Sequence, residues 1–158
     1  MTNISLLLIT KNESANINTW KTWLPKLKLV NELIVVDSQS TDDTVKKIQK
    51  LANKKLVVKT LDAENPHNFS SLRSQAIDKC KNDWILWLDA DETPSPKLIK
   101  FLNHFNSTNY NYSFPRRDTF LGEKLHHGET VNQSFLGFFN KNFGKFQGGV
   151  HEIWQTTK

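Results

Sequence analysis

Cysteine is almost absent from this chain of 158 residues, because Cys80 is the only one. A single cysteine cannot form a disulfide within the chain, which argues against the disulfide-built secreted domains and favours a reducing compartment. The longest apolar run near the N-terminus, residues 6–9, is too short for the core of a secretory signal. No run approaches the roughly eighteen apolar residues of a membrane-spanning helix. We therefore expect a soluble, cytoplasmic protein.

Internal repeats and low-complexity segments are also lacking, and the length suits a single domain. The net charge is +5, with several lysines in short groups such as Lys46-Lys47 and Lys54-Lys55. Such groups are typical of solvated helix faces, and attraction to anionic lipid or to a phosphorylated substrate is the alternative. The basic pI is not accompanied by any nucleic-acid-binding motif, so we expect no nucleic-acid partner.

Apolar runs alternate with helical patterns over the first ninety residues. Strands are predicted at residues 3–10, 33–36, 56–61 and 84–88. Helices are predicted at residues 13–24, from the caps Ser40, Thr41 and Asp43 to about residue 51, and at 71–80. This alternation predicts an α/β domain with a mainly parallel sheet flanked by helices. A helix over residues 94–105 follows, and the aromatic-rich remainder predicts short strands at 110–115, 119–121, 134–140 and 145–148.

Residues 84–92, W-I-L-W-L-D-A-D-E, form a solid apolar run that stops at three carboxylates. The apolar part fits a strand buried on both faces of a parallel sheet. If the extended geometry persists past Leu88, Asp89 and Asp91 project to the same side, about 7 Å apart. Two carboxylates so placed suit Mg²⁺ or Mn²⁺ carrying a diphosphate. The alternative is a polar turn in which Asp91 or Glu92 caps the next helix.

Three polar residues follow or end predicted strands: Thr10, Asp37 and Asp89. In open α/β sheets ligands collect at the carboxyl ends of the strands, so these residues should converge on one crevice. Asp37 has an alternative role as a helix cap.

Five short motifs occur in order along the chain: I-T-K-N-E (9–13), V-V-D-S-Q-S-T-D-D-T (35–44), L-R-S-Q-A (72–76), W-L-D-A-D-E (87–92) and G-V-H-E (149–152). Together they resemble family 2 glycosyltransferases of the Rossmann-like GT-A fold. Within that family they are most similar to small bacterial enzymes of the lipopolysaccharide core β-1,4-glucosyltransferase type. The resemblance implies a nucleotide-sugar donor, expected to be a UDP-hexose, together with a Mg²⁺ or Mn²⁺ ion and inversion at the anomeric carbon. It also implies a glycan or lipid-linked acceptor, reached by peripheral contact with the inner membrane surface.

The resemblance also assigns roles to residues of the donor half. Thr10, Asn12 and Glu13 would lie in the first nucleotide loop. Asp37 would accept a hydrogen bond from the base, and Arg73 would neighbour the diphosphate.

The remaining assignments concern the metal and the base. Asp89 would face the ribose or the metal, and Asp91 would hold the metal, with His151 completing its shell. Glu152 emerges from a glycine turn and is the expected catalytic base, and Asp118 is the reserve candidate. The alternative for His151 and Glu152 is pairing with Arg or Lys near the terminus.

We expect residues 1–106 to form the donor-binding half and residues 107–158 an acceptor-side part, incomplete because relatives in the subgroup are longer. A truncated or non-catalytic GT-A module is the main competing interpretation. A haloacid dehalogenase phosphatase is disfavoured, because its D-x-D follows the first strand and here the motif follows the fourth. A sugar nucleotidyltransferase is disfavoured because residues 10–15 contain no glycine.

Overall fold

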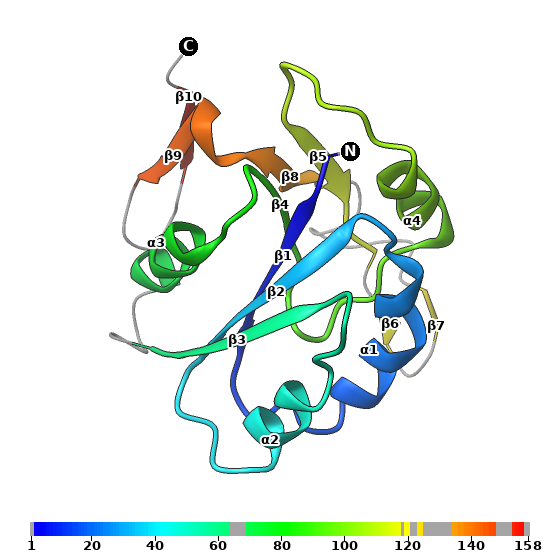
Figure 1. Ribbon diagram of the computed structural model, residues 1–158, viewed down its shortest axis with the longest axis vertical. Coiled ribbons are helices and arrows are strands. Elements are labelled where there is room, and N and C mark those ends of the chain that lie inside the picture. Colours follow the sequence, from blue (N-terminus) through cyan, green and yellow to red (C-terminus); the bar gives the residue numbers. More distant parts are fainter. Residues whose placement is uncertain are drawn as a thin grey trace.

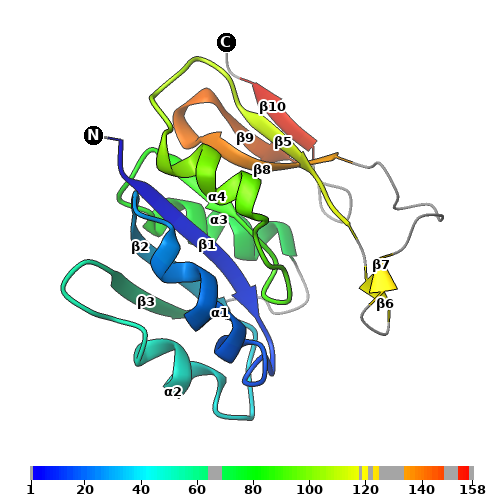
Figure 2. The same cartoon turned by 90° about the vertical axis from the view of Figure 1, so that its right-hand side faces the viewer.

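The structure is a computed structural model that describes residues 2–63, 69–117, 119–120, 123–124, 134–147 and 153–156. Its centre is a six-stranded sheet in the order β3-β2-β1-β4-β8-β5, with helices on both faces (Figures 1 and 2). The strands β1 to β4 are parallel, whereas β8 runs antiparallel to both of its neighbours. The predicted α/β class, with a mixed C-terminal part, is confirmed.

The elements follow one another in the order β1 (Ile4–Thr10), α1 (Ile17–Trp23), η1 (Leu24–Lys26), β2 (Val30–Asp37), α2 (Thr44–Gln49), β3 (Val57–Asp62), α3 (Phe69–Lys79), β4 (Trp84–Trp87), α4 (Pro96–Asn103), β5 (Tyr112–Pro115), β6 (Thr119–Phe120), β7 (Glu123–Lys124), β8 (Ser134–Asn140), η2 (Lys141–Phe143), β9 (Gly144–Gln147) and β10 (Ile153–Thr156). In the part of the chain that the structure describes, no helix is long and apolar enough to cross a membrane.

The central strand β1 is buried on both faces, as the continuous apolar run at residues 6–9 predicts. Leu6 and Leu8 point into the core under α1, α2 and α4, where Trp20 is completely buried. Leu7, between them, points into a second core under α3, where it meets Leu72. The sheet is thus a middle layer between two cores.

Three local details differ from the sequence-based expectation. The first helix α1 is shorter than predicted, because it begins at Ile17 and ends at Trp23, where the tighter 3₁₀ turn η1 follows with Pro25 inside it. The helix α4 begins at Pro96, because the Ser95 hydroxyl accepts from the Leu98 N–H and caps it. The strands β7 and β10 were not predicted; each is short and gains its partner from a hairpin.

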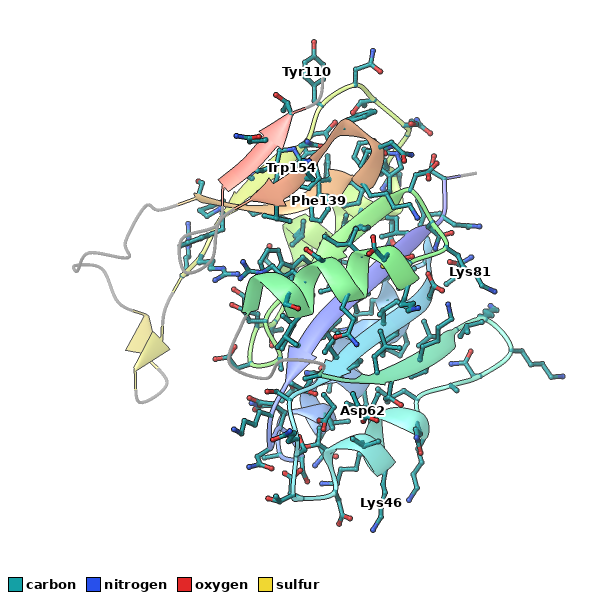
Figure 3. All side chains as sticks on the ribbon, turned by 90° about the vertical axis from the view of Figure 1, so that its left-hand side faces the viewer. Lys46, Asp62, Lys81, Tyr110, Phe139 and Trp154 are labelled. Carbon is teal, nitrogen blue, oxygen red and sulfur yellow. The ribbon has the colours of Figure 1, made fainter. Side chains whose placement is uncertain are left out.

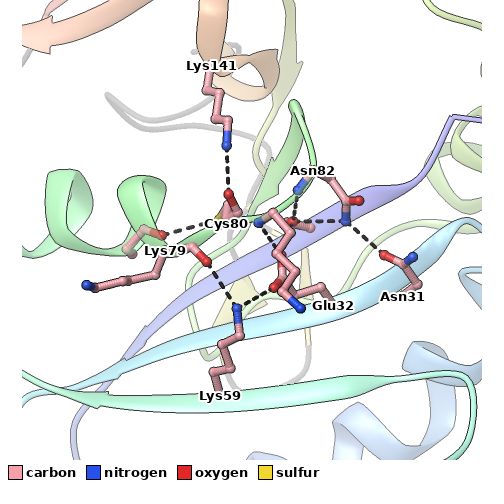
Figure 4. Close-up of polar contacts among 10 residues, drawn as sticks. Asn31, Glu32, Lys59, Lys79, Cys80, Asn82 and Lys141 are labelled. Atoms are coloured by element: carbon pink, nitrogen blue, oxygen red, sulfur yellow. Dashed lines mark hydrogen bonds and ion pairs between the residues drawn. The ribbon is translucent and has the colours of Figure 1, made fainter.

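A buried carboxylate joins the strands at the end of the sheet opposite the carboxyl ends (Figure 4). Glu32 is only 3% exposed and accepts from Lys59 Nζ at 2.7 Å, Ser5 Oγ at 2.6 Å and Lys81 N at 2.8 Å. Burial raises the pKa of Glu32, but these hydrogen bonds outweigh it and leave the pKa below its usual value. Nearby Cys80 is buried, which raises its thiol pKa to about 12 and leaves it unreactive. This network is structural.

The aromatic residues of the C-terminal part build core on both sides of the sheet. Phe138 packs with Trp84 and Phe105 under α4. On the other face Phe139 meets Trp154 of β10, with ring centroids 4.7 Å apart (Figure 3). Gly144 lies so close to β10 that a Cβ would stand 2.3 Å from the Gln155 carbonyl oxygen, so only glycine fits there.

Candidate functional site

The carboxyl ends of β1 and β2 bring two predicted site residues together. Thr10 and Asp37 are paired in register, and both are buried. The Thr10 hydroxyl donates to Asp37 Oδ1 at 3.3 Å. On the other side of β1, Leu7 pairs with Trp87, and Asp89 follows two residues beyond the end of β4. Thr10, Asp37 and Asp89 therefore lie at or just beyond the carboxyl ends of three neighbouring strands.

The Asp37 carboxylate organises the loop that follows β2. Oδ2 accepts from the Ser40 N–H at 2.8 Å, and Oδ1 accepts from the Ser40 hydroxyl at 2.6 Å. Asp37 does not cap α2, and the predicted cap Asp43 occupies the N-cap position without a side-chain cap hydrogen bond. Asp42, one residue earlier, accepts from the Thr44 N–H at 2.9 Å. A carboxylate offers about four lone-pair directions, so Asp37 keeps capacity for a further donor such as a base N–H.

The loops after β1 and β2 are joined by hydrogen bonds. Asn12 lies in the left-handed region, with φ 57°. Its N–H donates to Ser40 Oγ at 2.8 Å, and its side-chain oxygen accepts from the Thr41 N–H at 2.8 Å. Gln39 also has a positive φ, of 60°. Glu13 Oε2 accepts from Asn16 Nδ2 at 2.6 Å. The side chains of Asn12 and Glu13 thus hold the shape of a loop that contains no glycine.

The acidic motif forms a turn rather than a continued strand. The strand β4 ends at Trp87, and the Glu92 N–H donates to the Asp89 carbonyl at 3.0 Å. Glu92 Oε2 in turn accepts from the Asp89 N–H at 2.8 Å. The extended alternation expected for Asp89 and Asp91 is therefore wrong, since the chain reverses between them. The alternative of a polar turn is the arrangement observed, but Ser95 caps α4 in place of Asp91 or Glu92.

Arg116, which directly follows β5, forms two ion pairs with this turn. Its NH1 lies 2.9 Å from Asp89 Oδ2, and its Nε lies 2.7 Å from Glu92 Oε1. The guanidinium also stacks over Phe135 at 4.4 Å from the ring centroid. Burial raises the pKa of Glu92 above its usual value, and the positive charge of Arg116 acts in the opposite direction. Arg116 thus neutralises two carboxylates of one turn.

A second arginine lies near the same turn. Arg73 of α3 stacks on Trp87, with Cζ 3.6 Å from the ring centroid. Burial lowers the pKa of Arg73 to about 10, while Asp89 acts to raise it and Arg116 to lower it. Arg73 therefore stays cationic at neutral pH and within electrostatic reach of Asp89.

Comparison with known proteins decides the family. The family model for glycosyl transferase family 2 matches residues 5–156. The chain belongs to glycosyltransferase family 2. An uncharacterized glycosyltransferase of Rickettsia felis is 32% identical over 96% of this chain and 52% of its own length. One from Rickettsia prowazekii is 40% identical over 62% of this chain and 31% of its own length.

This family 2 glycosyltransferase spans about half the length of the curated relatives that it matches first. Among solved structures it is similar to Staphylococcus aureus TarS 1–349, with a TM-score of 0.50 and 26% identity over 57% of this chain and 28% of the TarS chain. TarS 1–349 has also been solved with UDP and with UDP-GlcNAc. The GT-A fold implied by the sequence motifs is thus confirmed.

The acidic turn of this family 2 chain fits a divalent cation only when further ligands complete the metal shell. Within the described residues no group of three or more His, Cys, Asp or Glu side chains is close enough to hold a metal. Asp89 is 45% exposed and Asp91 is exposed, so both are accessible. Mg²⁺ typically takes one or two protein carboxylates and completes its shell with phosphate oxygens and water. The residues therefore fit a cation that arrives together with a diphosphate.

Several predicted residues fall outside the described ranges: Asp118, His151 and Glu152. Conversely, the sequence-based site did not include the pairing of Glu92 with Arg116. The available signal was a third acidic residue directly after D-A-D, together with two arginines after Pro115, but nothing local links residues so far apart.

Proposed function

We propose that this chain provides the donor-binding half of an inverting glycosyltransferase, which moves a hexose from a UDP-sugar to an acceptor hydroxyl with the help of a divalent cation. The observation that carries the proposal is the placement of Thr10, Asp37 and Asp89 at or just beyond the carboxyl ends of three adjacent strands, with Thr10 and Asp37 in contact. Open α/β sheets bind nucleotides at this position. The similarity to TarS, solved with UDP and UDP-GlcNAc, supports the donor class.

Asp37 would read the nucleotide base. Its carboxylate is buried and held by Thr10 and Ser40, so its orientation is set before the ligand arrives. A preorganised acceptor loses little entropy when it binds the imide N–H of uracil.

Arg73 and Arg116 would stabilise the departing nucleoside diphosphate. Both guanidinium groups act on Asp89, which is within ion-pair distance of Arg116. As the sugar leaves, negative charge grows on the diphosphate, and fixed cations in a partly buried site lower the barrier. Asp89 and Asp91 would hold the divalent cation. When bound, that ion would neutralise further diphosphate charge.

Inversion requires a base on the side of the sugar opposite the diphosphate, placed to remove the proton of the acceptor hydroxyl. Glu152 remains the candidate from the sequence, with Asp118 in reserve and His151 as a further metal ligand. The acceptor is proposed to be a glycan or a lipid-linked sugar.

Calorimetric titration with UDP, with and without Mn²⁺, tests this proposal. We expect UDP to bind and Mn²⁺ to tighten the binding at least about tenfold, because one cation would bridge protein carboxylates and diphosphate. GDP and CDP serve as base controls and should bind more weakly. Absence of UDP binding in both conditions would contradict the proposal.

A nucleotide-binding module without turnover is the second candidate, because the chain spans about half the length of the curated relatives described above. It would bind UDP in the same way. The two are separated by incubating the chain with UDP-glucose or UDP-GlcNAc and simple glycan acceptors, since only the enzyme releases UDP.

A further inference from the structure

The helix α4 and the loop after it form a basic face of the molecule, and this segment of the sequence contains no acidic residue. Residues 93–111 contain no Asp or Glu, although they include two lysines and a histidine. Lys97, Lys100 and His104 are exposed and follow the i, i+3, i+7 spacing of one helix face. Within the described ranges, no carboxylate lies within ion-pair distance of these three side chains.

These basic residues line a groove of about 530 Å³ with an aromatic floor. The floor consists of Phe101, Phe105 and Tyr112, and the Phe101 and Tyr112 ring centroids are 5.1 Å apart. Both rings also pack against Phe138 in the core, so the floor is part of the rigid body. Asn106 and Thr108 complete the groove.

The segment at residues 26–28 adds further positive charge beside the groove. Lys26 and Lys28, both exposed, are tied to the end of α4 by Asn103. The Lys28 N–H donates to Asn103 Oδ1 at 2.7 Å, and Asn103 Nδ2 donates to the Lys26 carbonyl at 2.8 Å. Between the groove residues Thr108 and Tyr112 in the sequence, Tyr110 is 73% exposed and points away from the body (Figure 3). An amphipathic ring beside lysines is typical of surfaces that meet a bilayer.

We propose that this basic face, made of Lys26, Lys28, Lys97, Lys100 and His104 around the aromatic groove, binds the surface of an anionic lipid bilayer, with lipid phosphates against Lys97 and Lys100. The charge is complementary to anionic headgroups, and the groove is wide enough for one. Single-stranded nucleic acid fits less well, because stacking platforms need successive exposed rings and Tyr110 alone is largely exposed here. The proposal is independent of donor binding, because the groove shares no residue with the proposed donor site.

Vesicle sedimentation with the whole chain tests the proposal. Phosphatidylcholine vesicles with and without phosphatidylglycerol are the probes, at low and high salt. We expect binding only to the vesicles that contain phosphatidylglycerol, weakened by salt because the attraction is electrostatic. Failure to bind these vesicles at low salt would overturn the proposal.

A pair of double variants makes the test specific. Lys97→Gln/Lys100→Gln should lower the vesicle partition coefficient by about tenfold or more, because each lysine near an anionic surface contributes roughly a fivefold factor. Lys79→Gln/Lys81→Gln removes the same charge from exposed positions at the end of α3, on the other side of the sheet, and should change binding less than about twofold. Both variants should keep the parent melting temperature and UDP affinity. Equal losses in the two variants would overturn the proposal, because general charge would then explain the binding.

Two soluble probes exclude the other sources of phosphate. Glycerol phosphate should bind far more weakly than vesicles, since it offers a single headgroup. Saturable binding of glycerol phosphate or of a single-stranded oligonucleotide, lost in Lys97→Gln/Lys100→Gln and without any vesicle binding, would assign the groove to that ligand and overturn the bilayer proposal.

Discussion

Replacing Arg116 by Gln removes the cation shared by Asp89 and Glu92 while keeping a polar side chain of similar length. The two ion pairs are 2.9 and 2.7 Å long, and all three side chains are between 24% and 45% exposed. Partly exposed ion pairs contribute about 0.2–1 kcal/mol each, and stacking over Phe135 adds a similar amount. We expect Arg116→Gln to lower the free energy of unfolding by about 1–2 kcal/mol at pH 7.

The loss should depend on pH in a defined direction. Burial raises the folded-state pKa of Glu92 above its usual value of 4.5. Protonated Glu92 therefore stabilises the folded state below pH 4.5, and this contribution is lost as the pH rises through the folded-state pKa. Arg116 offsets that loss, because it stabilises the charged form. The destabilisation by Arg116→Gln should therefore shrink by roughly half between pH 7 and pH 4.

Urea unfolding of parent and variant at the two pH values measures this effect. Arg117→Gln is the matched control, since Arg117 is the adjacent exposed arginine and its loss changes the net charge equally. Equal destabilisation by both substitutions, or a loss that is the same at pH 4 and pH 7, would refute the assigned pairing. In a separate titration, Arg116→Gln should weaken UDP binding but bind Mn²⁺ alone at least as tightly as the parent, because Asp89 loses a competing cation.

Three further substitutions test the donor site and the base. Asp91→Asn should weaken Mn²⁺-dependent UDP binding at least about tenfold without changing the melting temperature, because Asp91 is exposed; parent-like binding would remove it from the metal site. Asp37→Asn should reduce the UDP affinity measured by calorimetry about tenfold or more, whereas Ser40→Ala should mainly cost about 1 kcal/mol of stability in thermal melts. The opposite pattern would limit Asp37 to holding the loop after β2. Glu152→Gln in the full-length enzyme should leave UDP affinity unchanged and abolish sugar transfer, and retention of more than about a tenth of the rate would exclude Glu152 as the base.

The sequence alone determined the framework of the candidate site. The apolar runs of β1 and β4 are unbroken because both faces of these strands are buried, and such a pattern can be read without coordinates. Thr10 and Asp37 end such runs, and parallel strands place their carboxyl ends along one edge. Their meeting therefore follows from local pattern and the rules of α/β topology.

Tertiary structure decided how the acidic motif is arranged. The reversal at Asp89 depends on Glu92 folding back to the Asp89 N–H, and Arg116 holds both carboxylates from β5. That contact exists because β4 and β5 both pair antiparallel with β8, so their ends lie at the same edge of the sheet with one strand between them. Hydrophobic periodicity reports only which face of an element is buried. Partners from distant segments depend on strand order, which is a property of the whole packed chain.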